Sequence, residues 1–251
     1  MSGWLPELLE TMEKRMLADG YRSPDVQGAL KSIKKEAYWS ALYRQILACQ
    51  KCPFGQDRKA STQRVPGTGN RESPFMLVGE GPGFDEDRIG VPFTGISGAL
   101  LTVALHKLGL TRQEIYITNV LKCRPANNRT PDPEEVKTCG GFLAAELKLV
   151  KPKAILCLGR VAIQYFFPEV KSIKQIRGQW LDYGGIPVMP TYHPAYVLRQ
   201  TGVDLEMAKR QWWSDLVQAY KRAYQQDRET APIPEAAGLA ENLNGNTNQE
   251  Q

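Results

Sequence analysis

The sequence predicts an α/β protein in which helices cover both faces of a central, mostly parallel sheet. Between residues 75 and 226, short apolar strand patterns alternate with longer stretches of helical periodicity. Loops rich in Gly and Pro follow several of these strands, as in parallel sheets whose functional loops lie at the carboxyl ends of the strands. We therefore expect a three-layer αβα sandwich, preceded by a helical extension.

The predicted elements follow one another in a simple order. Residues 1–47 are expected to form a helical N-terminal extension, because apolar side chains recur at helical spacing on both sides of the breaker "GYRSPD". Residues 48–226 are expected to form the main domain, which opens with a loop composition over 48–74. Its strands and helices are then predicted at "FMLVGE" (75–80), 96–109, "EIYITNV" (114–120), 132–150, "AILCLG" (154–159), "RVAIQYFF" (160–167), "IPVMPTYHP" (186–194) and 204–226.

The composition is that of a soluble globular protein. Of its 251 residues, 42% are apolar and 24% are charged, which is close to the average for such proteins. The apolar runs fall well below the roughly 18 to 20 residues that a membrane span needs, and the N-terminus lacks the layout of a signal peptide. We therefore expect a cytoplasmic protein with no membrane contact.

Charge is unevenly distributed along the chain. Residues 227–251 carry five acidic side chains against one Arg, a net charge of −4 that leaves +9 on residues 1–226. The final segment is polar, has few apolar residues to bury, and is predicted to be a disordered acidic tail. A basic body suits a surface that binds a polyanion, although many solvated surfaces are equally basic.

Four of the five cysteines form two spaced pairs. Cys49 and Cys52 form C-x2-C, and Cys123 and Cys139 form C-x15-C. Four thiolates can hold either tetrahedral zinc or a 4Fe-4S cluster, and the spacing leaves both open. The wide second pair leans toward the cluster, because zinc ribbons prefer two close C-x2-C knuckles. Cys157, inside "AILCLG", is expected to be a small core residue.

Several motifs together resemble family 4 uracil-DNA glycosylases. They are "CQKC", "GTGN", "LVGEGPGFDEDRIGVPFTGISGALL", "ITNVLKCRPANNRTPDPEEVKTC", "LGRVA" and "PTYHPAYVLR", in this order over residues 48–200. The resemblance implies a uracil-DNA glycosylase-like fold, with a central parallel sheet between helices. It also implies a 4Fe-4S cluster held by the four paired cysteines, and so favours iron-sulfur over zinc.

The resemblance implies two catalytic residues. Excision of uracil produces an oxocarbenium-like sugar and a uracil anion, so the site needs negative charge or an oriented water at C1′ and a hydrogen-bond donor at uracil O2. Glu80 in "GEGPG" matches the family's acid and is expected to orient the water. His193 in "TYHPAY" matches its histidine and is expected to donate to the anion, whereas His106 is expected to be structural.

The remaining pocket residues follow from the same resemblance. Gly81 and Gly83 are expected to let the backbone approach a flipped base closely. Phe93 is expected to stack on that base, and the amide of Asn119 can both donate to it and accept from it. Other uracil glycosylases carry Asp and Tyr where this chain has the two glycines, so thymine must be excluded elsewhere. Glu86 is a candidate for shaping that filter.

DNA contacts are predicted from the segment after "HPAY" and from nearby basic residues. Leu198 is the candidate wedge between bases, and Arg199 is a candidate phosphate contact. We expect about five phosphate contacts, which would make binding fall with salt. The candidates are Arg58, Lys59, Arg64, Arg71, Lys122, Arg124, Arg129, Lys171, Lys174, Arg177 and Arg199.

The predicted function is that of a monofunctional DNA repair glycosylase acting on uracil in single- or double-stranded DNA. No lysine nucleophile is evident, and "RPANNRTPDPEE" lacks the basic, histidine-bearing insertion of relatives that become covalently attached to DNA. We therefore expect turnover, a monomer, and a protein partner for residues 1–47. Two alternatives stay open: a catalytically silent DNA-binding accessory module of the same fold, and a four-cysteine zinc protein acting on nucleotides.

Overall fold

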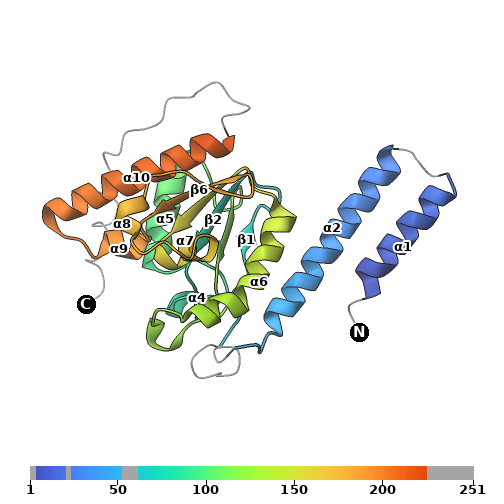
Figure 1. The fold of residues 1–251 in the computed structure, drawn as a ribbon, viewed down its shortest axis with the longest axis horizontal. Helices are drawn as coiled ribbons and strands as arrows, with labels where there is room; N and C mark the ends of the chain where they lie inside the picture. Colours follow the sequence, from blue (N-terminus) through green and yellow to red (C-terminus); the bar gives the residue numbers. More distant parts are fainter. Residues whose placement is uncertain (1–3, 21–23, 53–61, 225–251) are drawn as a thin grey trace, which may run out of the picture. The chain divides into compact units, whose positions relative to one another are not determined.

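The computed structural model describes residues 4–20, 24–52 and 62–224 (Figure 1). The predicted tail at 227–251 lies outside these residues. The chain divides into two compact units, Met1–Cys49 and Gln50–Gln251. None of the helices described is long and apolar enough to cross a membrane.

The first unit is a pair of antiparallel helices. Helix α1 spans Trp4–Ala18 and helix α2 spans Pro24–Leu47. Glu13 on the first helix forms an ion pair with Lys34 on the second. One turn away, the hydroxyl of Tyr38 donates a hydrogen bond of 2.7 Å to Glu10 Oε1. These contacts run in opposite directions along the two helices, as an antiparallel hairpin requires.

The second unit is built on a six-stranded sheet with the order β1-β3-β2-β4-β6-β5. The four central strands are parallel to one another, and the short edge strands are antiparallel to the strands beside them. Gly79 at the end of β2 is paired with Asn119 at the end of β3, so these two carboxyl ends are level. The strands are β1 (Thr68–Gly69), β2 (Phe75–Gly79), β3 (Tyr116–Asn119), β4 (Ala154–Leu158), β5 (Leu181–Tyr183) and β6 (Ile186–Thr191).

Helices cover both faces of the sheet, which confirms the predicted α/β sandwich (Figure 1). On one face, α5 (Ile96–Lys107), α9 (Pro194–Leu198) and α10 (Gly202–Tyr224) share a buried apolar cluster with the strands. On the other lie α6 (Pro133–Val150) and α7 (Arg160–Phe166). Cys157 in β4 is fully buried, and burial raises its thiol pKa well above its ordinary value, which confirms it as a core residue.

Short elements connect these layers and were not expected from the sequence. Helix α4 has only six residues, Phe84–Ile89, too few to show a helical period. In the sequence, its acidic first turn predicts a loop. Acidic side chains nevertheless stabilise the N-terminus of a helix. Further short helices are the 3-10 turn η1 (Ala126–Asn128) and α8 (Ile173–Ile176).

Candidate active site

A cavity of about 550 Å³ opens at the carboxyl ends of β2, β3 and β6. Parallel sheets present their binding sites at this edge, because the loops that follow neighbouring strands meet there. Almost all of the predicted pocket residues come together in this cavity, although they lie far apart in the sequence. The predicted residues lining it are Glu80, Gly81, Gly83, Glu86, Phe93, Asn119, His193 and Arg199.

The floor of the cavity depends on a glycine that the sequence alone did not single out. Gly79 ends β2, and a Cβ built there would lie 2.3 Å from Asn119 Oδ1 and 2.5 Å from Phe93 Cζ. Both distances are too short for real atoms, so no larger residue fits without displacing these side chains. The space beside Gly79 therefore sets the positions of the amide and the aromatic ring.

Asn119 presents an unpaired acceptor in a buried position. It is the last residue of β3 and is 2% exposed. Its Oδ1 has no hydrogen-bond partner among the residues that the structure describes. A buried polar atom without a partner is costly, and in a cavity it points to a ligand that supplies the missing donor. The same amide also carries two N–H donors.

Phe93 and His193 form an aromatic pair in the wall of the cavity. Their ring centroids are 5.7 Å apart and their planes differ by 27°, which is a stacked arrangement. Phe93 is buried and has a φ of 55°, an uncommon backbone conformation for a residue other than Gly. Gly98 in α5 allows this, since a Cβ there would lie 1.7 Å from the Phe93 carbonyl oxygen.

His193 is held in one neutral form. It caps the N-terminus of α9, where its Nδ1 accepts a hydrogen bond of 3.1 Å from the Ala195 N–H. Burial, with a further contribution from Arg199, lowers the pKa of His193 to about 4. The ring is therefore neutral at pH 7, and because Nδ1 is an acceptor the proton resides on Nε2. His193 thus offers one N–H donor.

Glu80 supplies the carboxylate nearest the end of β2. Its half-buried position raises its pKa above the ordinary 4.5, and the positive charge of Arg160 opposes that shift. The Glu80 backbone carbonyl accepts a hydrogen bond of 3.0 Å from the Leu121 N–H, which ties this loop to the segment after β3. A carboxylate that has lost part of its hydration is a stronger base than one in water.

Glu86 organises the loop around the cavity through backbone contacts. Its Oε2 accepts from the Gly83 N–H at 3.0 Å. Its Oε1 accepts from the N–H groups of Thr94 at 2.9 Å and Gly95 at 3.0 Å. One carboxylate therefore joins the start of α4 to the start of α5. Sequence alone could not show this, because the partners lie eight and nine residues further along the chain.

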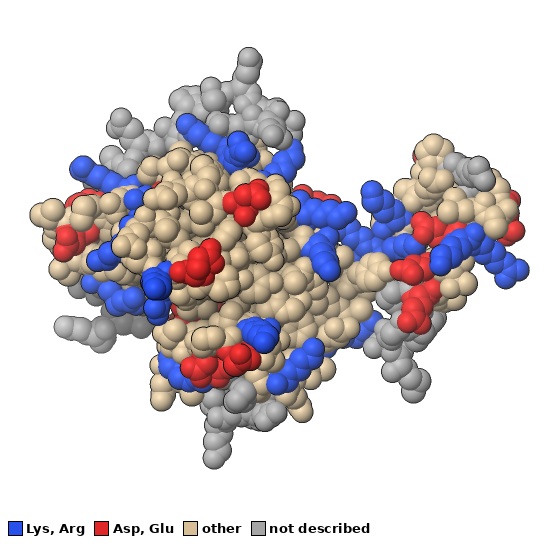
Figure 2. Space-filling model, in the orientation of Figure 1, with Lys and Arg blue, Asp and Glu red and all other residues tan. Residues whose placement is uncertain are grey.

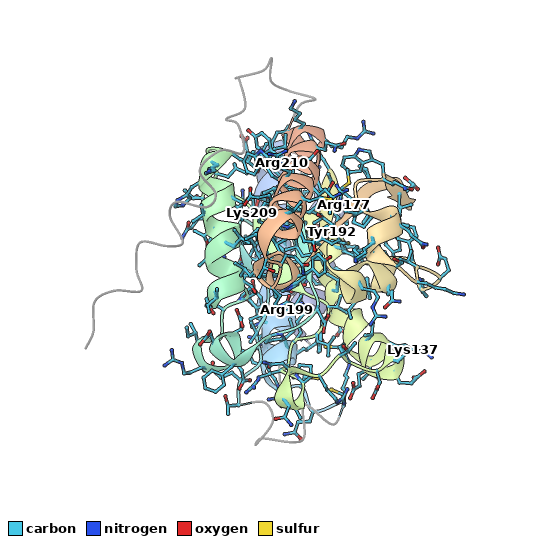
Figure 3. The ribbon with its side chains drawn as sticks, turned by 90° about the vertical axis from the view of Figure 1, so that its left-hand side faces the viewer. Lys137, Arg177, Tyr192, Arg199, Lys209 and Arg210 are labelled. Atoms are coloured by element: carbon cyan, nitrogen blue, oxygen red, sulfur yellow. The ribbon has the colours of Figure 1, made fainter. Side chains whose placement is uncertain are left out.

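The two predicted DNA contacts in the α9 segment differ in position. Leu198 packs against the apolar cluster and is not among the residues lining the cavity, so its role as a wedge stays a prediction. Arg199 is exposed and lines the cavity. In Figure 3, Arg199 lies below the α10 residues Lys209 and Arg210. Figure 2 shows further basic side chains on the left-hand side of the second unit, with acidic side chains among them.

Two of the predicted phosphate contacts belong to the interior, and a third is partly buried in an ion pair. Arg64 is 3% exposed and Lys122 is 1% exposed. Arg177 Nε donates to the buried carboxylate of Asp215 at 2.8 Å. The predictions for Arg64 and Lys122 were wrong, because a count of basic residues cannot distinguish a solvated cation from a buried one such as Lys122, which pairs with Glu146. Arg177 stays a prediction. Arg58 and Lys59 lie outside the described residues.

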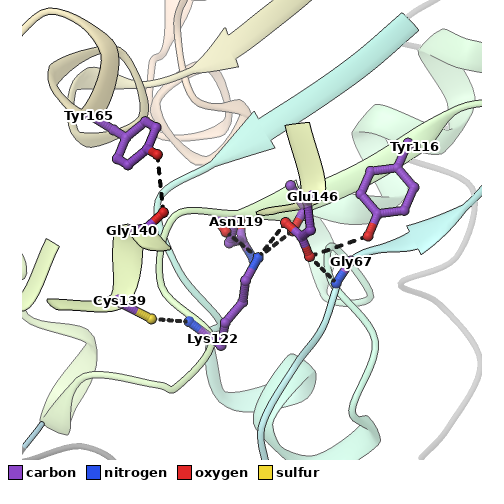
Figure 4. Close-up of polar contacts among 9 residues, drawn as sticks. Gly67, Tyr116, Asn119, Lys122, Cys139, Gly140, Glu146 and Tyr165 are labelled. Carbon is purple, nitrogen blue, oxygen red and sulfur yellow. Dashed lines mark hydrogen bonds and ion pairs between the residues drawn. The ribbon is translucent and has the colours of Figure 1, made fainter. Parts of the chain in front are cut away.

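Lys122 is the centre of a buried polar network that reaches the cavity (Figure 4). Its Nζ donates to Glu146 Oε2 at 2.8 Å, to Thr118 Oγ1 at 2.7 Å and to the Asn119 carbonyl at 2.8 Å. Glu146 is fully buried and also accepts from the Tyr116 hydroxyl at 3.3 Å. The network therefore holds the strand end that carries the Asn119 amide.

Three of the four paired cysteines are buried in the second unit. They are Cys52, Cys123 and Cys139. The Lys122 N–H donates to Cys139 Sγ at 3.3 Å. The Lys51 ammonium lies 5.5 Å from the centre of the Phe142 ring, so the segment with Cys52 meets the helix with Cys139.

The donor chemistry of these thiols fits an iron-sulfur group, since burial and N–H···S hydrogen bonds both suit cluster thiolates. Cys49, the remaining member of the pairs, is half-buried and ends the first unit. Within the described parts of the chain, no group of three or more His, Cys, Asp or Glu residues is arranged to hold a metal ion. The cluster therefore stays a prediction.

Comparison with known proteins identifies the class that this fold and cavity define. The family model of the uracil DNA glycosylase superfamily matches residues 66–217. The type-4 uracil-DNA glycosylase of Archaeoglobus fulgidus is 45% identical over 165 residues, covering 62% of this chain and 81% of that protein.

Two further relatives narrow this class to one family. The type-4 uracil-DNA glycosylase of Thermotoga maritima is 42% identical over 173 residues, covering 68% of this chain and 88% of that protein. The type-4 uracil-DNA glycosylase of Saccharolobus solfataricus is 41% identical over 163 residues, covering 61% of this chain and 74% of that protein. The chain therefore belongs to the type-4 uracil-DNA glycosylases, as the motifs predicted.

Proposed function

We propose that this chain is a DNA repair enzyme that takes a flipped uracil from DNA, hydrolyses its N-glycosidic bond and leaves an abasic site. The observation that carries the proposal is the convergence of an amide, an aromatic ring, a neutral histidine and a desolvated carboxylate on one cavity. They are Asn119, Phe93, His193 and Glu80. Family membership supports the same reaction.

Recognition of the base uses the buried amide and the aromatic ring. Uracil N3–H is a donor and O4 is an acceptor, so Asn119 Oδ1 accepts the first and its N–H donates to the second. This pairing satisfies the Oδ1 atom that lacks a partner among the described residues. Phe93 stacks on the face of the base, and the glycines of the loop let the backbone approach its edge.

Bond cleavage then separates charge between the two sides of the cavity. The C1′–N1 bond breaks with its electron pair on uracil, and His193 Nε2–H donates to the O2 atom where negative charge develops. Glu80 stabilises the positive sugar and orients a water, whose oxygen bonds to C1′ while its proton passes to the carboxylate. A neutral histidine, with its pKa lowered to about 4, remains a donor throughout the neutral pH range.

The direct experiment uses a labelled oligonucleotide that contains one uracil, either single-stranded or opposite G or A. After incubation with the protein, hot alkali should cleave the strand at the uracil. Without alkali the strand should stay intact, since a monofunctional enzyme leaves the backbone whole. Tight, salt-sensitive binding with no alkali-dependent cleavage would refute the proposal and favour the silent DNA-binding module.

Substitution of Gly79 with alanine should impair productive binding of the base. The added methyl would overlap Asn119 Oδ1 and the Phe93 ring, so both must move away from their positions. A displacement of this kind costs about 10²-fold in kcat/KM. Steady-state kinetics on the same oligonucleotide measures the loss. Gly141→Ala is the matched control, because a Cβ there has nothing within 4 Å. An unchanged kcat/KM in the Gly79 variant would contradict this account of the floor.

We further propose that Cys49, Cys52, Cys123 and Cys139 hold a 4Fe-4S cluster. When bound, the cluster acts as a structural cross-link between the segments that carry its thiolates. Purified protein should be brown and contain iron and acid-labile sulfide, and Cys139→Ser should lower both the iron content and the thermal stability. A colourless protein with bound zinc would contradict the proposal and favour the zinc alternative.

A further inference from the structure

The mouth of the cavity carries two large apolar side chains exposed to solvent. Phe84 is 61% exposed and Ile96 is 74% exposed, and both line the cavity. Phe84 begins α4 and Ile96 begins α5, so they lie at two helix starts beside the floor that would receive a flipped base. Neither side chain contributes to the buried apolar cluster. Their exposure beside a polar site indicates a binding partner with an apolar face.

The ring of Phe84 is already stacked on one side. The Arg124 guanidinium carbon lies 5.1 Å above the ring centre, and Arg124 Nε donates to Asn128 Oδ1 at 2.7 Å. The hydrogen bond to Asn128 holds the guanidinium over the ring, which reduces the entropy lost when a further group stacks there. Phe84 is therefore a preformed platform, with an arginine on one side and an exposed surface for a ligand.

The charges around this platform distinguish a base from a phosphate. Asp85 and Glu86 follow Phe84 directly in the first turn of α4 and also line the cavity. Their negative charge offsets the attraction of the Arg124 guanidinium for a phosphate, whereas an aromatic base is uncharged and has an apolar face that can stack on the ring. Aromatic side chains in proteins that bind single strands stack on bases in this way, largely regardless of sequence.

We propose that Phe84 stacks on the base of a nucleotide next to the uracil, while Arg124 packs behind the ring. The inference rests on the proposed function, because it is the flipped uracil in the cavity that brings a neighbouring nucleotide to the rim. The platform holds the strand beside the cavity and contributes to substrate binding rather than to bond cleavage. It therefore makes Phe84 a substrate-binding residue outside the uracil pocket itself.

The test compares Phe84→Ala with the conservative Phe84→Tyr, and uses Ile89→Ala as matched control. Ile89 lies on the same helix, is 50% exposed and is not among the residues lining the cavity. Loss of one stacked base should raise KM for a single-stranded uracil oligonucleotide about ten-fold in Phe84→Ala, with little change in kcat. Phe84→Tyr and Ile89→Ala should stay near the wild type.

A second substrate isolates the stack. In it, a stable abasic residue replaces the nucleotide on the 5′ or the 3′ side of uracil. On one of these two substrates, the wild-type KM should rise about as much as it does for Phe84→Ala on the intact oligonucleotide. The KM of Phe84→Ala should not rise further on that substrate. An unchanged KM in Phe84→Ala, an equal rise in Ile89→Ala, or the same loss with and without the neighbouring base would overturn the inference.

Failure of the proposed function would give a different result from failure of the platform. If the wild type released no uracil from any substrate, the proposed glycosylase function would be refuted. The Kd values of the wild type and the variants would then be measured on the same oligonucleotides. The stack predicts the same ratios between them as those given above for KM. Ratios near one in that comparison would overturn the platform independently.

Discussion

Replacement of His193 with alanine should lower kcat for uracil excision by about 10²- to 10³-fold, with a much smaller change in KM. The Nε2–H group acts on charge that appears only as the glycosidic bond breaks, so its loss affects the transition state more than the bound substrate. The hydrogen bond from Ala195 to Nδ1 holds the proton on Nε2, and burial keeps the ring neutral by lowering its pKa to about 4.

His106→Ala is the matched control for this substitution. The side chain of His106 is exposed on α5 and is not among those lining the cavity. Single-turnover measurements with excess enzyme separate the chemical step from product release, and the His106 variant should keep the wild-type rate. Equal rates for the wild type and His193→Ala would show that uracil leaves without this donor.

Glu146→Ala should lower the free energy of unfolding by about 3–5 kcal/mol. The substitution leaves the Lys122 ammonium buried without its counter-charge, with only the Thr118 hydroxyl and the Asn119 carbonyl as partners. Replacement of both charges, as in Lys122→Met with Glu146→Leu, should recover most of the loss, because a buried ion pair contributes little compared with an apolar pair of similar volume. Denaturant unfolding of the three proteins measures these differences.

An ion pair on α10 whose carboxylate is exposed provides the comparison for the buried one. Glu206 Oε1 accepts from Lys209 Nζ at 3.1 Å, and the Glu206 side chain is 58% exposed. Glu206→Ala should change the free energy of unfolding by less than about 1 kcal/mol. If Glu146→Ala were no more destabilising than Glu206→Ala, the network could not be what holds the end of β3.

The parallel strands and the main helices were predictable because their patterns are local. The runs "FMLVGE" and "AILCLG" are apolar throughout, as expected for strands buried on both faces, and they match β2 and β4. Family motifs then indicated Glu80, Asn119 and His193, each of which ends a strand or lies within two residues of its end. The common edge of a parallel sheet explains why these separate motifs line one cavity.

The remaining features depend on contacts that no local pattern records. Gly79 matters because two distant side chains occupy the space where its Cβ would be. Lys122 appears in the sequence as one more basic residue, the first of "KCRP", yet it neutralises Glu146, which lies 24 residues away. The exposed Phe84 sits in an acidic stretch, and only its position at the cavity mouth distinguishes it from a core aromatic.

The central claim is that the Glu80 carboxylate acts on the sugar as the bond to uracil breaks. Burial raises the Glu80 pKa above 4.5, so the wild-type excision rate should fall as pH decreases through that raised value. We would measure single-turnover excision against pH for the wild type and Glu80→Gln. The variant should be about 10²- to 10⁴-fold slower at neutral pH and should lose this acid limb. A variant with the wild-type rate, or with the same acid limb, would contradict this role of Glu80.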